Sequence, residues 1–329
     1  MKLNNYLQTI NEKNKIKSYK EDICLSGVGE IIELIYQDLK KQENREVIKL
    51  LKNIDINYQT LYSWKTNYNP IALSKLNNLL LFWKEECKKS QEEINFIWNR
   101  LYLENKGYSQ NSQKRVILPT ELDDELGYLI GFFQGDGHLK KDNKLIQENS
   151  IYFYEKGIEM INKINQMFEE TFSIKGNVYL GKNEHGRWYV LRICAKPIYL
   201  FFRDVLKLKA GRKTRNVEVP EIIKKSEESV QLSFIRGFFD AEGGVGETKK
   251  NPWLEIGQAS KEKPCEILIW IKDKLEKRGI ILSEPKRTKN QEYFRIRTAK
   301  RESIKRFFEI ISTYHPEKVI KFKKIIKNG

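Results

Sequence analysis

Leu126 to Gly137 have the sequence LGYLIGFFQGDG, and the same pattern recurs 106 positions later in FIRGFFDAEG, Phe234 to Gly243. Each stretch is a short apolar run with a small residue at every fourth position, and each ends in a carboxylate followed by glycine. If both runs are helical, the small residues form one stripe, along which two helix backbones can approach closely. The sequence therefore predicts a tightly packed pair of helices.

The stripes consist of four small residues, Gly131 and Gly135 in the first run and Gly237 and Ala241 in the second. Packing along them brings both helix C-termini together and places Asp136 beside Glu242. Helix C-termini carry partial negative charge, so this arrangement favours a hard cation such as Mg²⁺. A single GDG after an apolar helix is a common structural junction, and it is the pair that indicates a metal site.

These residues resemble the LAGLIDADG homing endonucleases of the monomeric type, which carry both motif copies in one polypeptide. Leu129 to Gly137 and Ile235 to Gly243 fill the motif's positions. The resemblance implies that Asp136 and Glu242 are the metal-binding acids.

One residue departs from the motif. Gln134 stands where the motif has its first Asp, whereas Asp240 keeps that acid in the second copy. In the family this position is generally not a metal ligand, so the departure leaves the predicted metal site intact.

The repeat extends beyond the motif. Three landmarks recur at similar spacing after each acid, namely Ala195-Lys196 and Ala299-Lys300, Phe202 and Phe308, and Lys213 and Lys318. The phenylalanines follow their acids by 66 positions and the lysines by 77 and 76. The resemblance therefore covers about Val116 to Lys327.

Hydrophobic periodicity predicts the same element order after each motif helix. In the first half we expect a hairpin, a helix, a hairpin and a helix, over His138 to Tyr154, Ile158 to Phe172, Ile174 to Cys194 and Pro197 to Leu208. In the second half the matching segments are Val245 to Ser260, Pro264 to Arg278, Ser283 to Thr298, and helices from Arg301 and Pro316. Each half is then αββαββα.

The predicted fold class is α+β, a pseudo-symmetric pair of αββαββα repeats at residues 118–225 and 226–329. The resemblance implies that the two antiparallel sheets form a saddle with DNA in its concave face. A small all-α domain at residues 1–106 is expected to precede them, joined by a polar linker at residues 107–117.

The amino-terminal region has the pattern of a helix-turn-helix. A short helix at Arg45 to Leu51 is followed by a break and by a second helix that Asn57 is placed to cap. In this second helix Leu61 and Trp64 are expected to be buried, and the polar candidates for DNA contact are Gln59, Thr60 and Ser63. The segment resembles the phage-repressor type. Small helical bundles with this spacing also occur without any role in DNA binding.

Composition agrees with a polyanionic partner. The 329 residues include 60 Lys plus Arg against 44 Asp plus Glu, a net charge of +16. Such charge suits nucleic acid or an anionic membrane, although Lys-rich proteins can also simply carry solvated positive charge. No apolar run approaches the ~20 residues of a membrane span, and no signal peptide is evident, so we expect a cytoplasmic protein without a membrane partner.

The four cysteines are widely spaced, without a CxxC pair, and only three histidines are present. A zinc site or a disulfide framework is therefore not expected, and the cysteines are predicted to be reduced and mostly buried.

The segment Tyr293 to Arg297 shows how a sheet could contact DNA. Strand alternation places Phe294 and Ile296 inward and Arg295 and Arg297 outward. An outward arginine can bond guanine bidentately, contact a phosphate or simply be solvated. Further candidates of the same kind are Lys140, Gln147, Asn177, Lys182, Arg187, Lys286 and Arg287.

The resemblance implies metal-dependent hydrolysis of one phosphodiester on each DNA strand, with Mg²⁺ held between Asp136 and Glu242. Lys213 and Lys318 resemble the basic residues that flank the family's metal centre, where they would stabilise charge on the phosphate or orient water. Since the chain is rich in lysine, each could also be ordinary surface charge.

Three functions agree with the sequence: a site-specific double-strand endonuclease, a DNA-binding regulator on the same fold without cleavage, and an RNA maturase that assists splicing. Two intact acids favour the endonuclease over the regulator. The chain begins with Met1 and a helical region and ends without a splicing His-Asn pair. We therefore expect a free-standing, monomeric endonuclease acting on double-stranded DNA without an obligatory protein partner.

Overall fold

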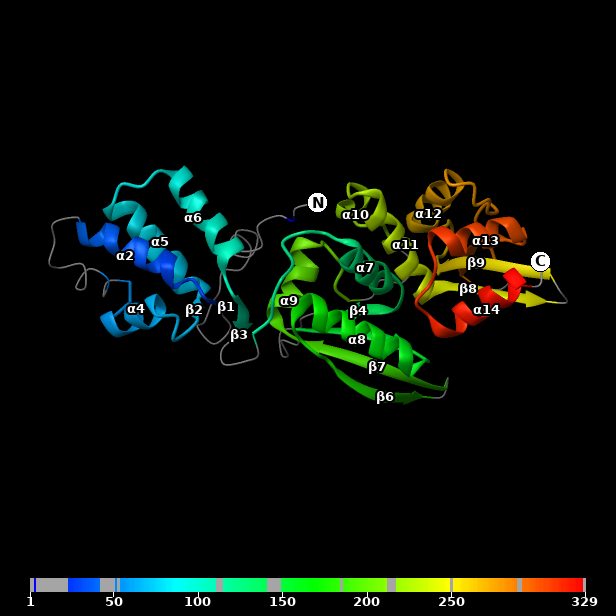
Figure 1. The fold of residues 1–329 in the computed structure, drawn as a ribbon, viewed down its shortest axis with the longest axis horizontal. Coiled ribbons are helices and arrows are strands. Elements are labelled where there is room, and N and C mark those ends of the chain that lie inside the picture. The colour runs from blue at the N-terminus through cyan, green and yellow to red at the C-terminus, as the bar shows by residue number, and fades with distance from the viewer. Residues whose placement is uncertain are drawn as a thin grey trace.

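The computed structural model describes Leu3, residues 23–41, Leu51, and residues 54–110, 115–140, 149–183, 186–211, 217–248, 251–288 and 292–327. Figure 1 shows three parts in chain order along the longest axis. The amino-terminal part (blue to cyan) lies at one end, the first repeat (green) in the middle and the second repeat (yellow to red) at the other end.

The amino-terminal part contains β1 (Ile23–Ser26), α2 (Gly29–Lys41), α4 (Tyr58–Lys65), β2 (Ile71–Ala72), α5 (Leu73–Glu86), α6 (Gln91–Glu104) and β3 (Gly107–Gln110). Its helices bury apolar faces; on α2, for example, Ile31, Ile32 and Ile35 are buried. Helix α6 begins at a capping box, in which Ser90 Oγ accepts from the backbone N–H of Glu93 and the Glu93 side chain accepts from that of Ser90.

The prediction of an all-helical amino-terminal region was wrong. β1 pairs antiparallel with both β2 and β3, giving a three-stranded sheet in the order β2-β1-β3. β3 also occupies the start of the predicted linker, and its Tyr108 is 2% exposed. Strands of two to four residues are too short to show alternation in a sequence, and a polar stretch can pair when a partner strand lies beside it.

The first repeat contains α7 (Asp124–Asp136), β4 (Gly137–Leu139), β5 (Ser150–Glu155), α8 (Ile158–Phe172), β6 (Asn177–Asn183), β7 (Gly186–Cys194), α9 (Lys196–Leu200) and the π-helical turn η2 (Phe201–Val205). The second contains α10 (Glu221–Lys224), α11 (Glu228–Glu242), β8 (Gly243–Thr248), β9 (Asn251–Ala259), α12 (Glu266–Glu276), β10 (Lys286–Arg287), β11 (Tyr293–Thr298), α13 (Arg301–Ile310) and α14 (Pro316–Lys327). The predicted hairpins and helices are confirmed.

Each repeat has a four-stranded antiparallel sheet, ordered β4-β5-β7-β6 in the first and β8-β9-β11-β10 in the second. Helices cover one face of each sheet, and there Ile151, Phe153, Leu191 and Ile256 are fully buried. The opposite face is called the outer face below. The equal strand order confirms the pseudo-symmetric α+β fold of two repeats.

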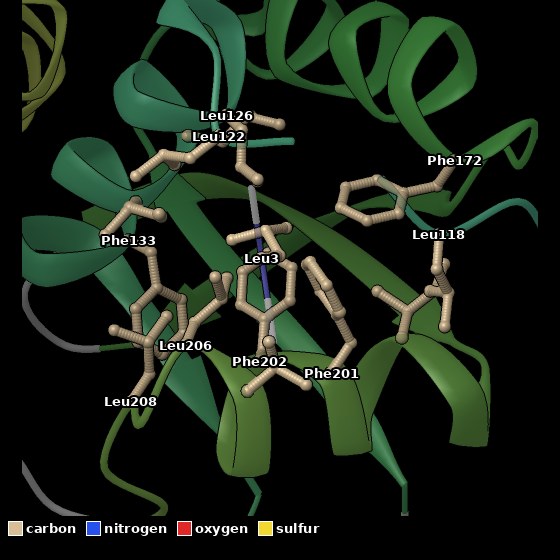
Figure 2. Close-up of a cluster of buried hydrophobic side chains, with 14 of the residues drawn as sticks. Leu3, Leu118, Leu122, Leu126, Phe133, Phe172, Phe201, Phe202, Leu206 and Leu208 are labelled. Carbon is tan, nitrogen blue, oxygen red and sulfur yellow. The ribbon is translucent and has the colours of Figure 1, made fainter. Parts of the chain in front are cut away.

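Leu3 connects the start of the chain to the first repeat. Its backbone N–H donates to the carbonyl of Thr120 at 2.9 Å, and its side chain is 6% exposed. Figure 2 shows Leu3 inside a cluster of apolar side chains that includes Leu122, Phe201 and Phe202. The amino-terminal part is thus attached to the first repeat at both of its ends.

No helix among the described residues combines the length and the apolar character that crossing a bilayer requires. The structure pairs none of the four cysteines in a disulfide, as predicted. Only Cys24 and Cys265 are buried, however, and Cys194 is exposed because it ends strand β7.

Candidate active site between the repeats

Helices α7 and α11 touch through their backbones along the predicted stripe of small residues. A Cβ atom on Gly131 would lie 2.0 Å from the carbonyl oxygen of Phe234, and one on Gly237 would lie 2.1 Å from that of Tyr128. Both distances are well inside van der Waals contact, so even alanine would force the helices apart. The two glycines therefore set the separation of the repeats.

The acids lie where this helix contact ends. A Cβ atom on Gly135 would lie 2.4 Å from Cβ of Ala241 and 2.9 Å from Cγ of Glu242, so the Glu242 side chain lies beside the backbone of α7. Asp136 is the last residue of α7 and Glu242 the last of α11, and both are half-buried. The helix pair thus carries one carboxylate from each repeat at the same end.

Glycine is required directly after each acid. A Cβ atom on Gly137 would lie 2.3 Å from the Phe133 ring, and one on Gly243 would lie 2.1 Å from the Phe239 ring. Each glycine is also the first residue of a strand, β4 or β8. The chain therefore passes from helix to sheet without a loop, which fixes both acids between the two sheets.

The chemistry of this donor set fits a divalent cation that shares its ligands with a substrate. Carboxylate oxygens are the protein ligands that Mg²⁺ prefers. Among the described residues, no group of three or more His, Cys, Asp or Glu side chains could hold a metal ion. Mg²⁺ is commonly held by one or two carboxylates together with substrate phosphates, and two facing acids match that arrangement.

Lys318 lies in the same cluster of charges. Its ammonium group donates to the carbonyls of Phe239 and Asp240, both at 2.7 Å, at the C-terminal end of α11, and the residue is 8% exposed. Burial lowers the pKa of this ammonium group, and four carboxylates oppose the shift: Asp240, Glu155, Asp136 and Glu242. The structure thus brings one predicted lysine to both predicted acids.

Asp240 is fully buried, and the sequence did not indicate a role for it. Its carboxylate accepts hydrogen bonds from the Tyr128 hydroxyl at 2.8 Å, from the backbone N–H of Tyr314 at 2.9 Å and from the Thr313 hydroxyl. Burial raises the pKa of the Asp240 carboxyl group, whereas the Lys318 ammonium and these donors lower it. These partners offset part of the cost of burying the carboxylate.

Gln134 holds the equivalent position in α7 but bonds differently. Its side-chain amide donates to the carbonyl of Glu218 at 2.8 Å. The residue equivalent to Tyr128 in α11 is Phe234, which has no hydroxyl group to donate. The sequence contains a signal for this difference, because both positions change together between the repeats. Tyr128 is paired with Asp240, whereas their equivalents are Phe234 and Gln134.

On the outer face of the second sheet, β11 shows the predicted alternation. Phe294 and Ile296 are buried, whereas Arg295 and Arg297 are half-exposed. The Arg295 guanidinium group lies 3.0 Å from the Glu255 carboxylate, and that of Arg297 lies 5.5 Å from the Trp253 ring. Both arginines are therefore held by neighbours on β9 while remaining accessible to a ligand.

Three other predicted DNA-contacting residues share the outer faces. Lys286 pairs with Arg295 across β10 and β11, and Asn177 pairs with Arg192 across β6 and β7. Lys140 is exposed just after β4, next to the buried Leu139.

Strand alternation removes three predicted residues from these faces. Lys182 pairs with Arg187, one step out of phase with Asn177, and Arg287 pairs with the buried Phe294. All three are exposed near strand ends but lie on the helix side of their sheets. Successive strand residues point to opposite faces, so neighbours in sequence cannot share one.

In the amino-terminal part, Asn57 caps α4 as predicted by accepting from the backbone N–H of Thr60 at 2.8 Å. Gln59 is exposed and Thr60 is half-buried. Ser63 is also half-buried, and its hydroxyl accepts from the side chain of Asn69. Most of the other helix of the predicted helix-turn-helix lies outside the described residues, as do Gln147 and Lys213.

Comparison with known proteins identifies both repeats. The family model for the LAGLIDADG-like domain matches residues 123–205 and 229–312. Over 161 residues the chain is 30% identical to a glutamine–fructose-6-phosphate aminotransferase of Methanocaldococcus jannaschii. The aligned residues make up 49% of this chain and 13% of that protein. The chain is 23% identical over 328 residues to the replication factor C small subunit of the same organism, covering 97% of this chain and 15% of that protein.

The chain therefore spans about one seventh of the length of these curated relatives. Among solved structures, it is similar to the crystal structure of I-DmoI in complex with DNA and Mn, with 20% identity and a TM-score of 0.43. That similarity covers 58% of this chain and 98% of the other.

Proposed function

The chain belongs to the family of LAGLIDADG-like domains, and from that premise we propose that it is a site-specific endonuclease that hydrolyses one phosphodiester on each strand of DNA. The observation that carries this proposal is the contact of α7 with α11, which ends in Asp136 from one repeat and Glu242 from the other. Because one chain supplies both acids, no second copy is needed, and we propose that the protein acts as a monomer.

The residues between the repeats have distinct roles in this reaction. Asp136 and Glu242 would hold the divalent cations, which we propose to be Mg²⁺. A bound divalent cation polarises a phosphate and lowers the pKa of a bound water. Lys318 places positive charge at the same end of α11; an ammonium group has three N–H donors, and two of them bind the Phe239 and Asp240 carbonyls. The third can bind a phosphate oxygen or a water, and Lys213 is the proposed counterpart in the first repeat.

We propose that the outer faces of both sheets contact the DNA. Arg295 and Arg297 suit bidentate recognition of guanine in the major groove, and Lys286, Asn177 and Lys140 lie on or beside the same faces. A net charge of +16 supports binding to a polyanion. Lys182, Arg187 and Arg287, on the helix side, are better suited to phosphate contacts at the edge of the interface, and Gln147 remains a candidate base contact.

We further propose that residues 23–110 form a separate domain that extends the DNA footprint. Gln59, Thr60 and Ser63 on α4 are its candidate contacts. In this division β3 belongs to the amino-terminal domain, and the repeats occupy residues 118–225 and 226–329.

The decisive experiment is cleavage of a randomised double-stranded DNA library by the full chain with Mg²⁺. Asp136→Asn and Glu242→Gln remove one negative charge each with little change of shape, and Ca²⁺ in place of Mg²⁺ tests the cation. We expect cleavage at one sequence with Mg²⁺, and its loss in both variants because each acid supplies one side of the site.

Sequence-selective binding without cutting would contradict the nuclease proposal. It would leave a DNA-binding regulator on the same fold, the second function compatible with the residues. Cutting that survives both substitutions would instead show that these acids are not the metal ligands.

A further inference from the structure

On the basis of the proposed endonuclease function, we propose that Asp240 is a positioning residue that fixes Lys318 beside one scissile phosphate, and that the two half-sites are therefore not equivalent. A half-site is the part of the active site that acts on one DNA strand. The proposal concerns the half-site at the end of α11, whose counterpart at the end of α7 is built differently.

The Asp240 carboxylate anchors the segment that precedes α14. It accepts from the backbone N–H of Tyr314 at 2.9 Å and from the hydroxyl of Thr313. The Thr313 hydroxyl oxygen in turn accepts from the backbone N–H of His315 at 3.1 Å. Since Asp240 is fully buried, these bonds do not compete with water, and they hold residues 313–315 in one place.

This anchor determines where Lys318 lies. α14 begins at Pro316, so Lys318 is in its first turn, directly after the anchored segment. The Lys318 ammonium group then reaches back to the backbone carbonyl of Asp240 at 2.7 Å. Asp240 thus makes two contacts with this segment. Its side chain binds the loop before α14, and its backbone carbonyl binds the Lys318 ammonium group.

Tyr314 extends the anchor to the first repeat. Its ring lies 5.0 Å from the Tyr128 ring on α7 and 5.5 Å from the ammonium group of Lys163 on α8. Its hydroxyl accepts from the Arg236 guanidinium group at 3.0 Å. Together with the hydrogen bond from Tyr128 to Asp240, these contacts tie the α13–α14 loop to both repeats.

The described residues at the pseudo-symmetric position do not form this anchor. There Phe234 stands for Tyr128 and Gln134 for Asp240, and the Gln134 side chain donates a hydrogen bond to Glu218. An uncharged donor cannot replace a buried carboxylate that accepts three hydrogen bonds. Gln134 also lines an open pocket of about 320 Å³ together with Lys207 and Lys209, whereas Asp240 is fully buried.

This difference predicts unequal rates for the two strands. A charged group that is already in place stabilises the transition state without reorganisation, and small displacements of such a group are costly. The half-site with Lys318 is organised before DNA binds. We therefore expect its strand to be cut first and a nicked intermediate of one polarity to accumulate.

The test uses the target sequence recovered from the library, with a different dye on each strand. Asp240→Asn keeps the side-chain shape but loses the charge and one acceptor oxygen. We expect it to slow cleavage of one strand by about 100-fold and to leave the other close to the wild-type rate. Tyr128→Phe should slow the same strand by a smaller factor. The matched control is Asp204→Asn, because Asp204 is also a buried carboxylate but pairs with Arg203 in η2, and it should not favour either strand.

A second measurement does not depend on cleavage. Reductive methylation of the metal-free protein, followed by mass spectrometry, reports how accessible each lysine is. In the wild type Lys318 should be protected. In Asp240→Asn it should be modified at least ~10-fold faster, because the loop before α14 loses acceptor strength at its anchor and the ammonium group loses a neighbouring carboxylate charge. Lys321, half-exposed on the same helix, serves as the internal reference.

The outcomes separate the two proposals. If the wild type cuts no DNA, the endonuclease proposal fails, and the methylation rate of Lys318 alone decides whether Asp240 positions it. If Asp240→Asn slows both strands equally, or leaves Lys318 protected, Asp240 only stabilises the fold and the inference is overturned.

Discussion

At the scale of residues, one motif position has opposite hydrogen-bonding roles in the two repeats. Asp240 accepts three hydrogen bonds inside the protein, whereas Gln134 donates one to a loop carbonyl. The difference follows from Tyr128, which can donate, and Phe234, which cannot. In the role proposed for it, Asp240 contributes to the active site by placing Lys318 and not by binding metal.

His315 gives a pH-dependent prediction. Burial lowers the pKa of its imidazole below the usual 6.5, with a further contribution from Lys318, while Glu155, Asp240 and Glu317 oppose the shift. The unfolded chain therefore binds this proton at higher pH than the native protein does. As pH falls below about 6.5, stability is lost until the native pKa is reached.

His315→Gln should remove that loss. Between pH 7.5 and 5.5 we expect the wild type to lose more unfolding free energy than the variant, by at most about 1.4 kcal/mol per pH unit. Urea denaturation at both pH values measures the difference. Equal losses in the two proteins would show that His315 binds its proton alike in both states.

Arg295 gives a prediction about recognition. Arg295→Ala should relax the base preference at one position of the target by about 1–3 kcal/mol, because a bidentate contact to a base is lost. Lys182→Ala is the control, since Lys182 lies on the helix side of its sheet and should leave base preference unchanged. Binding to a library of single-base target variants compares them, and a uniform loss of affinity for Arg295→Ala would indicate a phosphate contact.

At the scale of elements, the contact between α7 and α11 decides the geometry of the site. Gly131 and Gly237 allow backbone contact, and Gly137 and Gly243 allow each strand to begin directly after its helix. The acids are therefore held by main-chain packing rather than by long side chains.

Gly131→Ala tests this packing. Alanine favours a helix by about 1 kcal/mol over glycine, but its Cβ would meet the Phe234 carbonyl. We expect a net loss of at least about 2 kcal/mol of unfolding free energy, measured by urea denaturation. Gly157→Ala is the matched control, because its Cβ would meet nothing closer than 3.6 Å and its φ of −89° suits alanine. A stabilised Gly131→Ala protein would refute the close approach.

At the scale of the whole molecule, the amino-terminal part is joined to the first repeat in two ways. The chain runs directly from β3 into the first repeat, and Leu3, near the start of the chain, packs against that repeat. Leu3 lies in the core of the first repeat, and β1 begins only at Ile23. The amino-terminal part is therefore an insertion between two segments of chain that are both held by the first repeat, which limits how far it can separate from the sheets.

Leu3→Ala should lower the unfolding free energy of the repeats by about 2–4 kcal/mol, because it leaves a cavity in the cluster of Figure 2. Thermal and urea denaturation, followed by circular dichroism, measure the change. Leu103→Ala provides the comparison, since Leu103 is 67% exposed and should change stability by less than about 0.5 kcal/mol. Equal effects would mean that Leu3 does not pack in this core in solution.

Local pattern was sufficient for much of this protein. The paired motifs, the helix α8 from Ile158 to Phe172 and the alternation in β11 could be predicted because hydrophobic period and small-residue spacing are written along the chain itself. The short strands β1 and β2 could not be predicted, since strands of four and two residues exist only when partners from distant segments supply their hydrogen bonds.

The sequence by itself determined the pseudo-symmetric fold and the two acids, because both depend on spacing within single helices and on their repetition. Only the tertiary structure decided that Lys318 lies near them, which basic residues share a sheet face, and that Asp240 is the centre of a buried network. Those properties depend on contacts between residues as far apart as Tyr128 and Tyr314, whose approach no local pattern encodes.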